Sequence, residues 1–331
     1  MPPVAAPGIG RRAVLLAQLA IPGIASPVAG QAVPPRVAWL SATRAADGSI
    51  FLDELRAGLR DLGHVEGRDI RLDDFWGEES AERTAALAAE IVAAAPRVIV
   101  AQGAATLALK RAGEAVPVVF GYSGDPVEAG LVDSLARPGR NRTGISYLTL
   151  ELVGKRMELL KQALPRARRV AVLANPQHAG DQAERRASQA AADALGLALD
   201  YFEARNAAQL GDALAAIAAA RPDAAMLFPV QSVIANRVRI AQWAIAARIP
   251  TVSGWAQFAQ GGNLMSYGPN LREASRRLAA FVDRILKGAR AADLPVEQPA
   301  RVELVLNLRA AKALGVELPP ALLARADEVI E

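Results

Sequence analysis

Residues 36–63 read RVAWLSATRAADGSIFLDELRAGLRDLG, and they contain in order the two kinds of element from which the chain is built. The apolar run RVAWL has the length of a buried strand, whereas SIFLDELRAGLRDLG spaces its apolar residues as an amphipathic helix does. The same succession recurs along the chain. Strands that alternate with helices of this length predict parallel sheets that helices cover on both faces.

The predicted strands fall into two series. The later runs begin at Ile70, Arg97, Pro117 and Thr143 in the first series and at Arg169, Ala198, Ala224, Pro250 and Asn263 in the second. A helix expected to begin near Glu151 separates them. Each series makes a five-stranded, doubly wound sheet of ordinary domain size, so we predict two lobes rather than one wide sheet. A further strand, VELVLN, and two short helices follow near the C-terminus.

The chain is expected to cross between the lobes more than once, which creates a hinge beside a cleft. We predict the first return near residues 262–268 and another crossing near Pro295. The predicted division is residues 1–32 as a signal peptide, 33–147 and 262–294 as the first lobe, and 148–261 and 295–331 as the second.

The N-terminus has the order of a cleavable export signal. Arg11 and Arg12 precede the apolar run AVLLAQLAIPGIA, which is too short to span a membrane, and small residues stand at Gly30 and Ala32. We therefore predict a mature chain that begins near Val33 in a periplasmic or extracytoplasmic compartment. The paired arginines leave both the general and the twin-arginine export routes open.

Composition excludes several classes of protein. The sequence has no Cys, which excludes disulfides, thiolate nucleophiles and a lipid anchor on a cysteine. The formal charge of +4 becomes +2 without Arg11 and Arg12, and basic and acidic residues alternate, so no nucleic-acid surface is expected. Hydrophobic residues make up 52% of the chain, enough for a large core.

Catalytic motifs are missing from the sequence. The phosphate-binding loop and the dinucleotide fingerprint are both absent, and WLSATRAADG follows the first strand instead. Ser123 stands in GYSGD, where a nucleophile elbow needs Gly in place of Asp125. With only His64 and His178 in the chain, a metal site is not expected. No cofactor is predicted.

Ligands of open parallel sheets bind beyond the carboxyl ends of the strands, so the loops there hold the candidate residues. Hydroxyls and a helix N-terminus after the first strand could receive an anion, although Asp47 or Ser49 could simply cap that helix. Gln102 and Gly103 offer an amide and a close backbone approach. Asp125 before Pro126 could equally be a helix cap. The candidates on the first lobe are Ser41, Thr43, Gln102, Gly103, Tyr122, Ser123 and Asp125.

The equivalent loops of the second lobe hold the other half of the predicted site. Trp255 follows a strand and could stack on a ligand or pack in the core near the hinge. The candidates on this side are Asn175, His178, Gln231, Ser253 and Trp255. We expect both sets to face one another, because one lobe alone offers too few walls to bury a small ligand.

Three longer stretches carry a family resemblance. FGYSGDPVEAGLVDSLARPGRNRTGIS at residues 120–146, KRMELLKQALPRARRVAVLANP at 155–176, and the C-terminal segment from Ile285 that includes LPPALLARADEVIE resemble the ABC transporter substrate-binding protein family. The resemblance covers nearly the whole mature chain. Gln102-Gly103-Ala104-Ala105 departs from it, since a Thr-Gly-Thr type loop is usual there, and His64 replaces a common aromatic residue.

The resemblance implies a type I periplasmic binding protein fold, small-molecule capture without catalysis, and delivery to an ABC transporter permease. An amino acid is among the ligands that it suggests, and a monomer is expected. Two other functions stay open on the sequence. The chain could be a sensing module that presents its bound form to a membrane receptor, or an exported hydrolase that uses Asp125 and His178. A repressor's effector domain is disfavoured by the export-type N-terminus.

Overall fold

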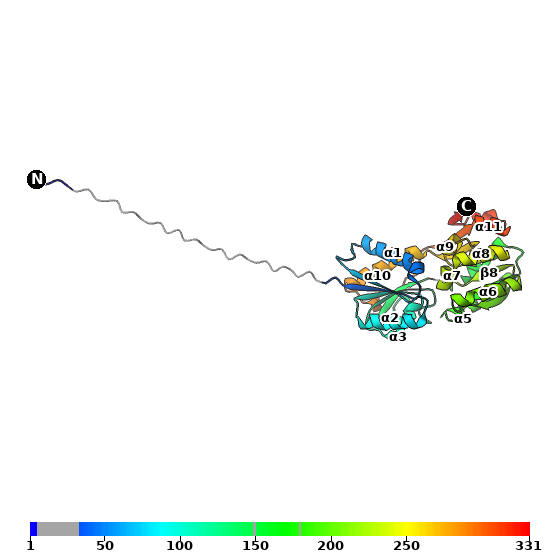
Figure 1. Ribbon diagram of the computed structural model, residues 1–331, viewed down its shortest axis with the longest axis horizontal. Coiled ribbons are helices and arrows are strands. Elements are labelled where there is room, and N and C mark those ends of the chain that lie inside the picture. Colours follow the sequence, from blue (N-terminus) through cyan, green and yellow to red (C-terminus); the bar gives the residue numbers. More distant parts are fainter. Residues whose placement is uncertain (5–32, 148–149, 179) are drawn as a thin grey trace. The chain divides into compact units, whose positions relative to one another are not determined.

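Two α/β lobes, each built on its own sheet, make up residues 34–331 (Figure 1). The computed structural model describes residues 1–4, 33–147, 150–178 and 180–331. Residues 34–331 form one compact unit. Residues 5–32 of the predicted signal peptide lie outside the described part of the chain.

The first sheet is wholly parallel and has the strand order β2-β1-β3-β4-β5. Its strands are β1 (Arg36–Ser41), β2 (Arg71–Trp76), β3 (Val98–Gln102), β4 (Val118–Tyr122) and β5 (Arg142–Ser146). Its helices are α1 (Ala45–Asp61), α2 (Ala81–Ala93), α3 (Ala104–Ala112) and α10 (Leu271–Leu286).

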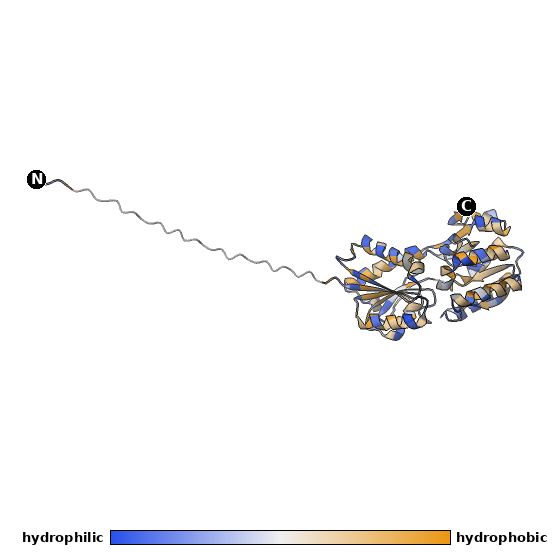
Figure 2. Cartoon of the chain, in the orientation of Figure 1, coloured by the Kyte–Doolittle hydropathy of each residue, from blue (hydrophilic) through white to orange (hydrophobic). Residues whose placement is uncertain are grey.

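Side-chain alternation along β1 shows why helices cover both faces of this sheet. Val37 and Trp39 pack in one apolar cluster with residues of α1 and α10. Ala38 and Leu40 point the other way and pack with residues of α2 and α3. Because consecutive strand residues face opposite sides, a strand that is apolar throughout needs a cover on each side. Figure 2 shows the apolar strands between helices whose outer surfaces are hydrophilic.

The second sheet has the order β12-β11-β10-β9-β8-β6-β7 and is parallel except where β10 meets β11. Its strands are β6 (Arg169–Ala174), β7 (Ala198–Glu203), β8 (Ala224–Leu227), β9 (Thr251–Ser253), β10 (Met265–Pro269), β11 (Val302–Asn307) and β12 (Glu328–Ile330). Every strand expected from the sequence is present, and β12 was not expected.

Helices cover both faces of the second sheet as well. These helices are α4 (Val153–Ala163), α5 (Asp181–Leu195), α6 (Ala207–Ala220), α7 (Gln231–Ala235), α8 (Arg237–Ala247), α9 (Ala256–Gln260), α11 (Leu308–Leu314) and α12 (Pro320–Leu323). Val170 and Val172 pack with α4, while Ala171 and Leu173 lie in the cluster that includes α6. A short 3₁₀ helix, η1 (Ala291–Asp293), lies against β5.

The structure corrects the predicted place of residues 262–269. The strand β10 pairs with β9 and β11 in the second sheet, so these residues do not belong to the first lobe. The chain enters the first lobe with α10, which packs against α1, β3, β4 and β5. Sequence pattern could not place β10, because an apolar strand suits either sheet and its partners lie far along the chain.

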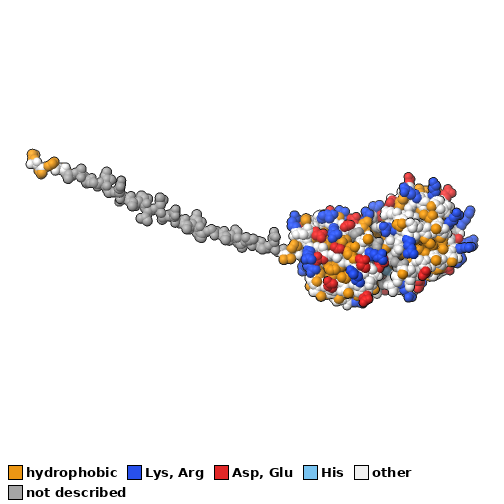
Figure 3. Space-filling view, viewed as in Figure 1, with side chains coloured by type: hydrophobic (Ala, Val, Ile, Leu, Met, Phe, Trp, Pro, Cys, Tyr) orange, Lys and Arg blue, Asp and Glu red, His pale blue; other side chains and the backbone are white. Residues whose placement is uncertain are grey.

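The distribution of charged side chains on the surface agrees with the alternation of basic and acidic residues in the sequence. On the face drawn in Figure 3, basic and acidic side chains are interspersed rather than gathered by sign. None of the helices in the described ranges is both long enough and apolar enough to cross a membrane.

Candidate functional site

A cavity of about 440 Å³, here called the cleft, is lined from both lobes at the carboxyl ends of their strands. Gln102 and Tyr122 end β3 and β4 of the first sheet. Asn175 follows β6 and Trp255 follows β9 of the second sheet. Eight predicted site residues line this cleft: Thr43, Gln102, Gly103, Tyr122, Ser123, Asn175, His178 and Trp255. The strand-end rule therefore brings residues of two distant segments to one place.

The other predicted residues do not line the cleft. Ser41 is buried and its Oγ lies 2.9 Å from Thr43 Oγ1, so it supports a lining residue. Asp125 accepts hydrogen bonds from the backbone N–H groups of Val127 and Glu128 in a turn. Ser253 is fully buried and donates to the Leu227 carbonyl. For Gln231 the structure describes the backbone at the start of α7 but not the side chain.

Two local expectations about caps are wrong. The helix α1 begins at Ala45 with Arg44 as its N-cap, so Asp47 and Ser49 lie within the helix rather than capping it. Asp125 caps a hydrogen-bonded turn instead of a helix, because the Leu131 N–H bonds back to the Pro126 carbonyl and closes the turn. Local sequence preference for capping does not fix how long the capped segment continues.

The first-lobe wall is organised by a buried hydrogen bond. Tyr147 Oη donates to Gln102 Oε1 at 2.8 Å, which fixes the orientation of the amide. Gln102 Nε2 is buried and has no partner among the described residues. The pair lies against Gly121, where a Cβ would overlap Tyr147 Oη and stand 2.6 Å from Gln102 Oε1. The missing side chain at residue 121 is therefore what lets this pair form.

Gly121→Ala is expected to destabilise the protein by about 2 kcal/mol, since the added methyl group must displace a buried hydrogen-bonded pair. Tyr147→Phe removes the overlapping oxygen, so the same Gly121→Ala change should be milder in that background. Urea unfolding of the two single variants and the double variant measures this coupling. Strictly additive free energies of unfolding would contradict the packing described for Tyr147.

Tyr122 lines the cleft and carries a neutral phenol. Its side chain is buried, and burial, followed by the charges of Asp125 and Glu128, raises its pKa to about 12. The hydroxyl has no hydrogen-bond partner within the described ranges. At neutral pH it can therefore donate to or accept from a molecule in the cleft.

A hydrogen bond joins the two lobes at the cleft. Ser123 Oγ lies 3.0 Å from His178 Nε2. Burial lowers the pKa of His178 to about 4, so the imidazole is neutral at physiological pH. Because the Gly180 N–H donates to His178 Nδ1, the ring proton is on Nε2, which donates to Ser123. The Ser123 hydroxyl keeps its own proton for another partner.

Two carboxyl groups are buried behind His178. Glu184 Oε2 lies 3.8 Å from His178 Nδ1, and Asp181 begins α5 close by. Burial raises the pKa of Glu184 to about 8; Arg156 opposes this shift and Asp181 reinforces it. The glutamic acid is therefore protonated at neutral pH, and its contact with the neutral His178 is not an ion pair.

We expect stability to fall as pH rises from 6.5 to 8. A raised carboxyl pKa means that the folded state holds a proton which the unfolded state has released, so stability is lost up to pH 8. Below pH 6.5 the depressed pKa of His178 makes stability rise with pH, and this rise offsets the fall caused by Glu184. The loss between pH 6.5 and 8 should approach about 2 kcal/mol.

Urea unfolding at several pH values measures this dependence. Glu184→Gln should remove the fall, while Glu90→Gln on the exposed surface of α2 should leave it in place. An unchanged slope in Glu184→Gln would refute the assignment to this carboxyl group.

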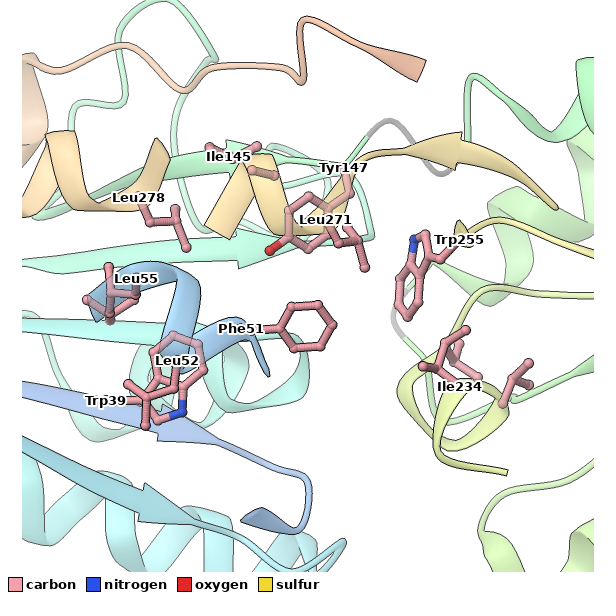
Figure 4. Close-up of a cluster of buried hydrophobic side chains, with 14 of the residues drawn as sticks. Trp39, Phe51, Leu52, Leu55, Ile145, Tyr147, Ile234, Trp255, Leu271 and Leu278 are labelled. Atoms are coloured by element: carbon pink, nitrogen blue, oxygen red, sulfur yellow. The ribbon is translucent and has the colours of Figure 1, made fainter. Parts of the chain in front are cut away.

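Trp255 forms the second-lobe wall. Its side chain is 3% exposed and belongs to the apolar cluster that also holds Phe51, Tyr147 and Leu271 of the first lobe (Figure 4). The indole Nε1 has no partner among the residues described. The ring therefore packs between the lobes and also lines the cleft, and stacking on a ligand stays a prediction.

Several lining residues were not predicted from the sequence. They are Phe51, Glu79, Ser80, Arg111, Tyr147, Arg205, Asn206 and Leu271, among others. Tyr147 comes directly after β5, so the strand-end rule could have found it. Phe51 and Leu271 lie on helices, and nothing local distinguishes them from core residues.

The charged side chains that line the cleft lie mainly at its exposed rim. Arg111 and Arg205 are exposed lining residues, and Glu79 forms an ion pair with Arg44 at 3.2 Å. Across the described ranges, no group of three or more His, Asp or Glu side chains could hold a metal ion. The cleft is thus suited to binding an organic molecule through hydrogen bonds and apolar contact.

Comparisons with known proteins agree with this arrangement. A family model described as ABC transporter substrate binding protein matches residues 50–330. A tyrosine-binding protein of Clostridioides difficile is 23% identical over 282 residues, which cover 80% of this chain and 78% of that protein.

Solved structures give the same fold. A conserved domain protein from Vibrio cholerae has a TM-score of 0.85 at 27% identity, and the match covers 90% of this chain and all of that one. A domain from Streptococcus pneumonia in complex with L-Trp has a TM-score of 0.83 at 20% identity, with the same coverage.

Proposed function

Because the chain belongs to the ABC transporter substrate-binding protein family, we propose that it captures a small molecule in the cleft and delivers it to an ABC importer. Its family and its structural relatives are substrate-binding proteins, and the chain is a binding protein rather than an enzyme. The observation that carries the proposal is the cleft itself. Residues from the strand ends of both lobes line it, and buried polar groups there lack partners within the described ranges.

Capture works by contacts that both lobes make with the same molecule. Gln102, Tyr122 and Ser123 supply the first wall, and His178 and Trp255 supply the second. A ligand shifts the protein toward a closed form only by binding that form more tightly than an open one. The Ser123–His178 hydrogen bond also joins the lobes, since its two residues lie in loops that follow strands of different sheets.

An amino acid is one candidate ligand. The relative from Clostridioides difficile is a tyrosine-binding protein, and the structure from Streptococcus pneumonia holds L-Trp. Both support small molecules that carry an aromatic ring and a carboxylate. The size of the cleft, about 440 Å³, suits ligands of this kind.

A thermal-shift screen over amino acids, small carboxylates and purines tests the binding function. A ligand at 100 times its dissociation constant adds about 2.7 kcal/mol of stability, which raises the unfolding temperature measurably. A hit should lose affinity in Gln102→Ala and in Trp255→Ala when titrated by calorimetry. If changes on the second lobe leave affinity untouched while first-lobe changes abolish it, capture by two lobes is refuted.

We also propose that the protein acts outside the cytoplasm as a monomer beside its permease. Substrate-binding proteins of ABC importers are generally extracytoplasmic. The export-type segment at residues 1–32 supports the same compartment. N-terminal sequencing of the protein from its native host should find a chain that begins near Val33, and an intact Met1 would refute export by cleavage.

A further inference from the structure

Three residues that line the cleft each carry a buried polar atom without a partner among the described residues. They are Gln102 Nε2, Tyr122 Oη and Trp255 Nε1, and these residues are 9%, 2% and 3% exposed. A buried polar group without a hydrogen bond destabilises the folded state, so most such groups have a partner. All three residues line the cleft, Gln102 and Tyr122 from the first lobe and Trp255 from the second, which indicates that a bound molecule supplies these partners.

The unpartnered groups are mainly hydrogen-bond donors. An indole N–H can only donate. The Gln102 amide presents its NH₂ group, because Tyr147 holds the amide oxygen. The Ser123 hydroxyl retains its proton, since it accepts from His178. A ligand that satisfies the Gln102 and Ser123 donors must offer acceptor oxygens on the side that meets the first lobe.

The backbone at this wall also favours negative charge. The helix α3 starts immediately after Gly103, whose φ is 56°, and its N-terminus has no side-chain cap. A Cβ at residue 103 would meet nothing within 4 Å, so the helix start is open to the cleft. Free N–H groups and the helix dipole stabilise an anion at such a point. Gln102 Nε2 is the neighbouring donor on the same strand end.

The cleft offers few acidic side chains that could pair with a positively charged group of a ligand. Glu79 is the only acidic side chain that lines it within the described part of the chain, and Arg44 already pairs with that carboxylate. Arg111 and Arg205 add positive charge at the rim. An ammonium group would therefore lie near cations without a free carboxylate to offset them.

The remaining wall is apolar and includes flat side chains. Phe51 and Leu271 from the first lobe stand opposite Trp255 from the second (Figure 4). An aromatic ring fills a space of this kind well, because aromatic pairs add stacking to the burial of apolar area.

We propose that the cleft takes an aromatic carboxylate that carries no ammonium group, such as an aryl 2-hydroxy acid or 2-oxo acid. The carboxylate lies at the start of α3 beside Gln102, and the ring lies against Trp255. This assignment rests on the proposed capture function and names its substrate class. The proposed ligand differs from an amino acid, which the relatives bind, because it has no ammonium group next to its carboxylate.

The test compares L-3-phenyllactate with L-phenylalanine, which differ by a hydroxyl in place of an ammonium group. Calorimetric titration of the full mature chain should give phenyllactate at least a tenfold lower dissociation constant. Equal affinity, or tighter binding of phenylalanine, overturns the substrate class while leaving the capture function intact. Binding of neither probe also overturns it, and the capture function fails separately if the wider screen finds no ligand.

Gln102→Glu supplies a second arm of the experiment. The new carboxylate repels the ligand's own carboxylate, so affinity for phenyllactate should fall at least tenfold. It also offers a partner for an ammonium group, so the ratio of the phenylalanine dissociation constant to the phenyllactate dissociation constant should decrease. The matched control is Gln162→Glu on α4, whose side chain accepts from Arg325; neither residue lines the cleft. If Gln102→Glu and Gln162→Glu bind phenyllactate equally well, Gln102 does not face the carboxylate and the proposed pose is overturned.

Discussion

Gly144→Ala is expected to destabilise the protein by about 3 kcal/mol or more, because backbone conformation and space both exclude a side chain at this position. Gly144 lies in β5 with a φ of 149°, which residues other than glycine rarely adopt. It is the register partner of Phe120, and a Cβ at residue 144 would overlap the Phe120 carbonyl oxygen and stand 2.6 Å from its nitrogen. Backbone atoms within a sheet cannot move aside as a flexible side chain can.

The other side of β5 offers no relief. The Gly144 carbonyl accepts from the Glu297 N–H at 2.9 Å, and the Ser146 N–H donates to the Glu297 carbonyl at 3.0 Å. Thr143 Oγ1 donates to the Leu294 carbonyl at 2.7 Å. The strand is thus held from both sides, and an outward shift would break these hydrogen bonds.

Urea denaturation measures the effect, with Gly154→Ala in α4 as the matched control. A Cβ at Gly154 would meet nothing within 4 Å, and alanine has the higher helix propensity. That variant should be as stable as the parent or up to about 1 kcal/mol more stable. Equal unfolding midpoints for both variants would contradict the strand geometry described for residue 144.

Trp255→Ala is expected to lower stability by about 3 kcal/mol or more and to abolish measurable capture. The ring is almost wholly buried in a cluster that draws on both lobes, so its removal leaves a cavity between them. Trp255→Phe keeps a ring in that place but removes the Nε1 donor. Its loss of affinity should be about tenfold, which corresponds to one hydrogen bond.

Trp243→Phe separates the cleft from general packing. Trp243 on α8 packs against the same apolar cluster, but it does not line the cleft. Calorimetry with the ligand found by the thermal-shift screen should therefore show near-normal affinity for Trp243→Phe. If Trp243→Phe and Trp255→Phe lose affinity equally, the indole of Trp255 is not a ligand contact.

Part of the site could be found without the structure. Gln102, Ser123, His178 and Trp255 were predicted because parallel strands end at the edge where ligands bind, and the structure places all four on the cleft. Ser253 and Asp125 obey the same rule but turn away. Ser253 donates to a neighbouring strand's carbonyl, and Asp125 satisfies the N–H groups of its own turn. The rule locates a loop, and the nearest hydrogen-bond partner decides where its side chain points.

The sequence by itself determined the two mainly parallel sheets, because a run such as RVIVA is apolar on both faces and needs helices over each. Only the tertiary structure decided that β10 joins the second sheet and that Tyr147 fixes Gln102. It alone buried Glu184 beside His178 and changed the pKa of both. Periodicity reports the environment of one segment, whereas these features depend on segments far apart in the chain that fold against each other.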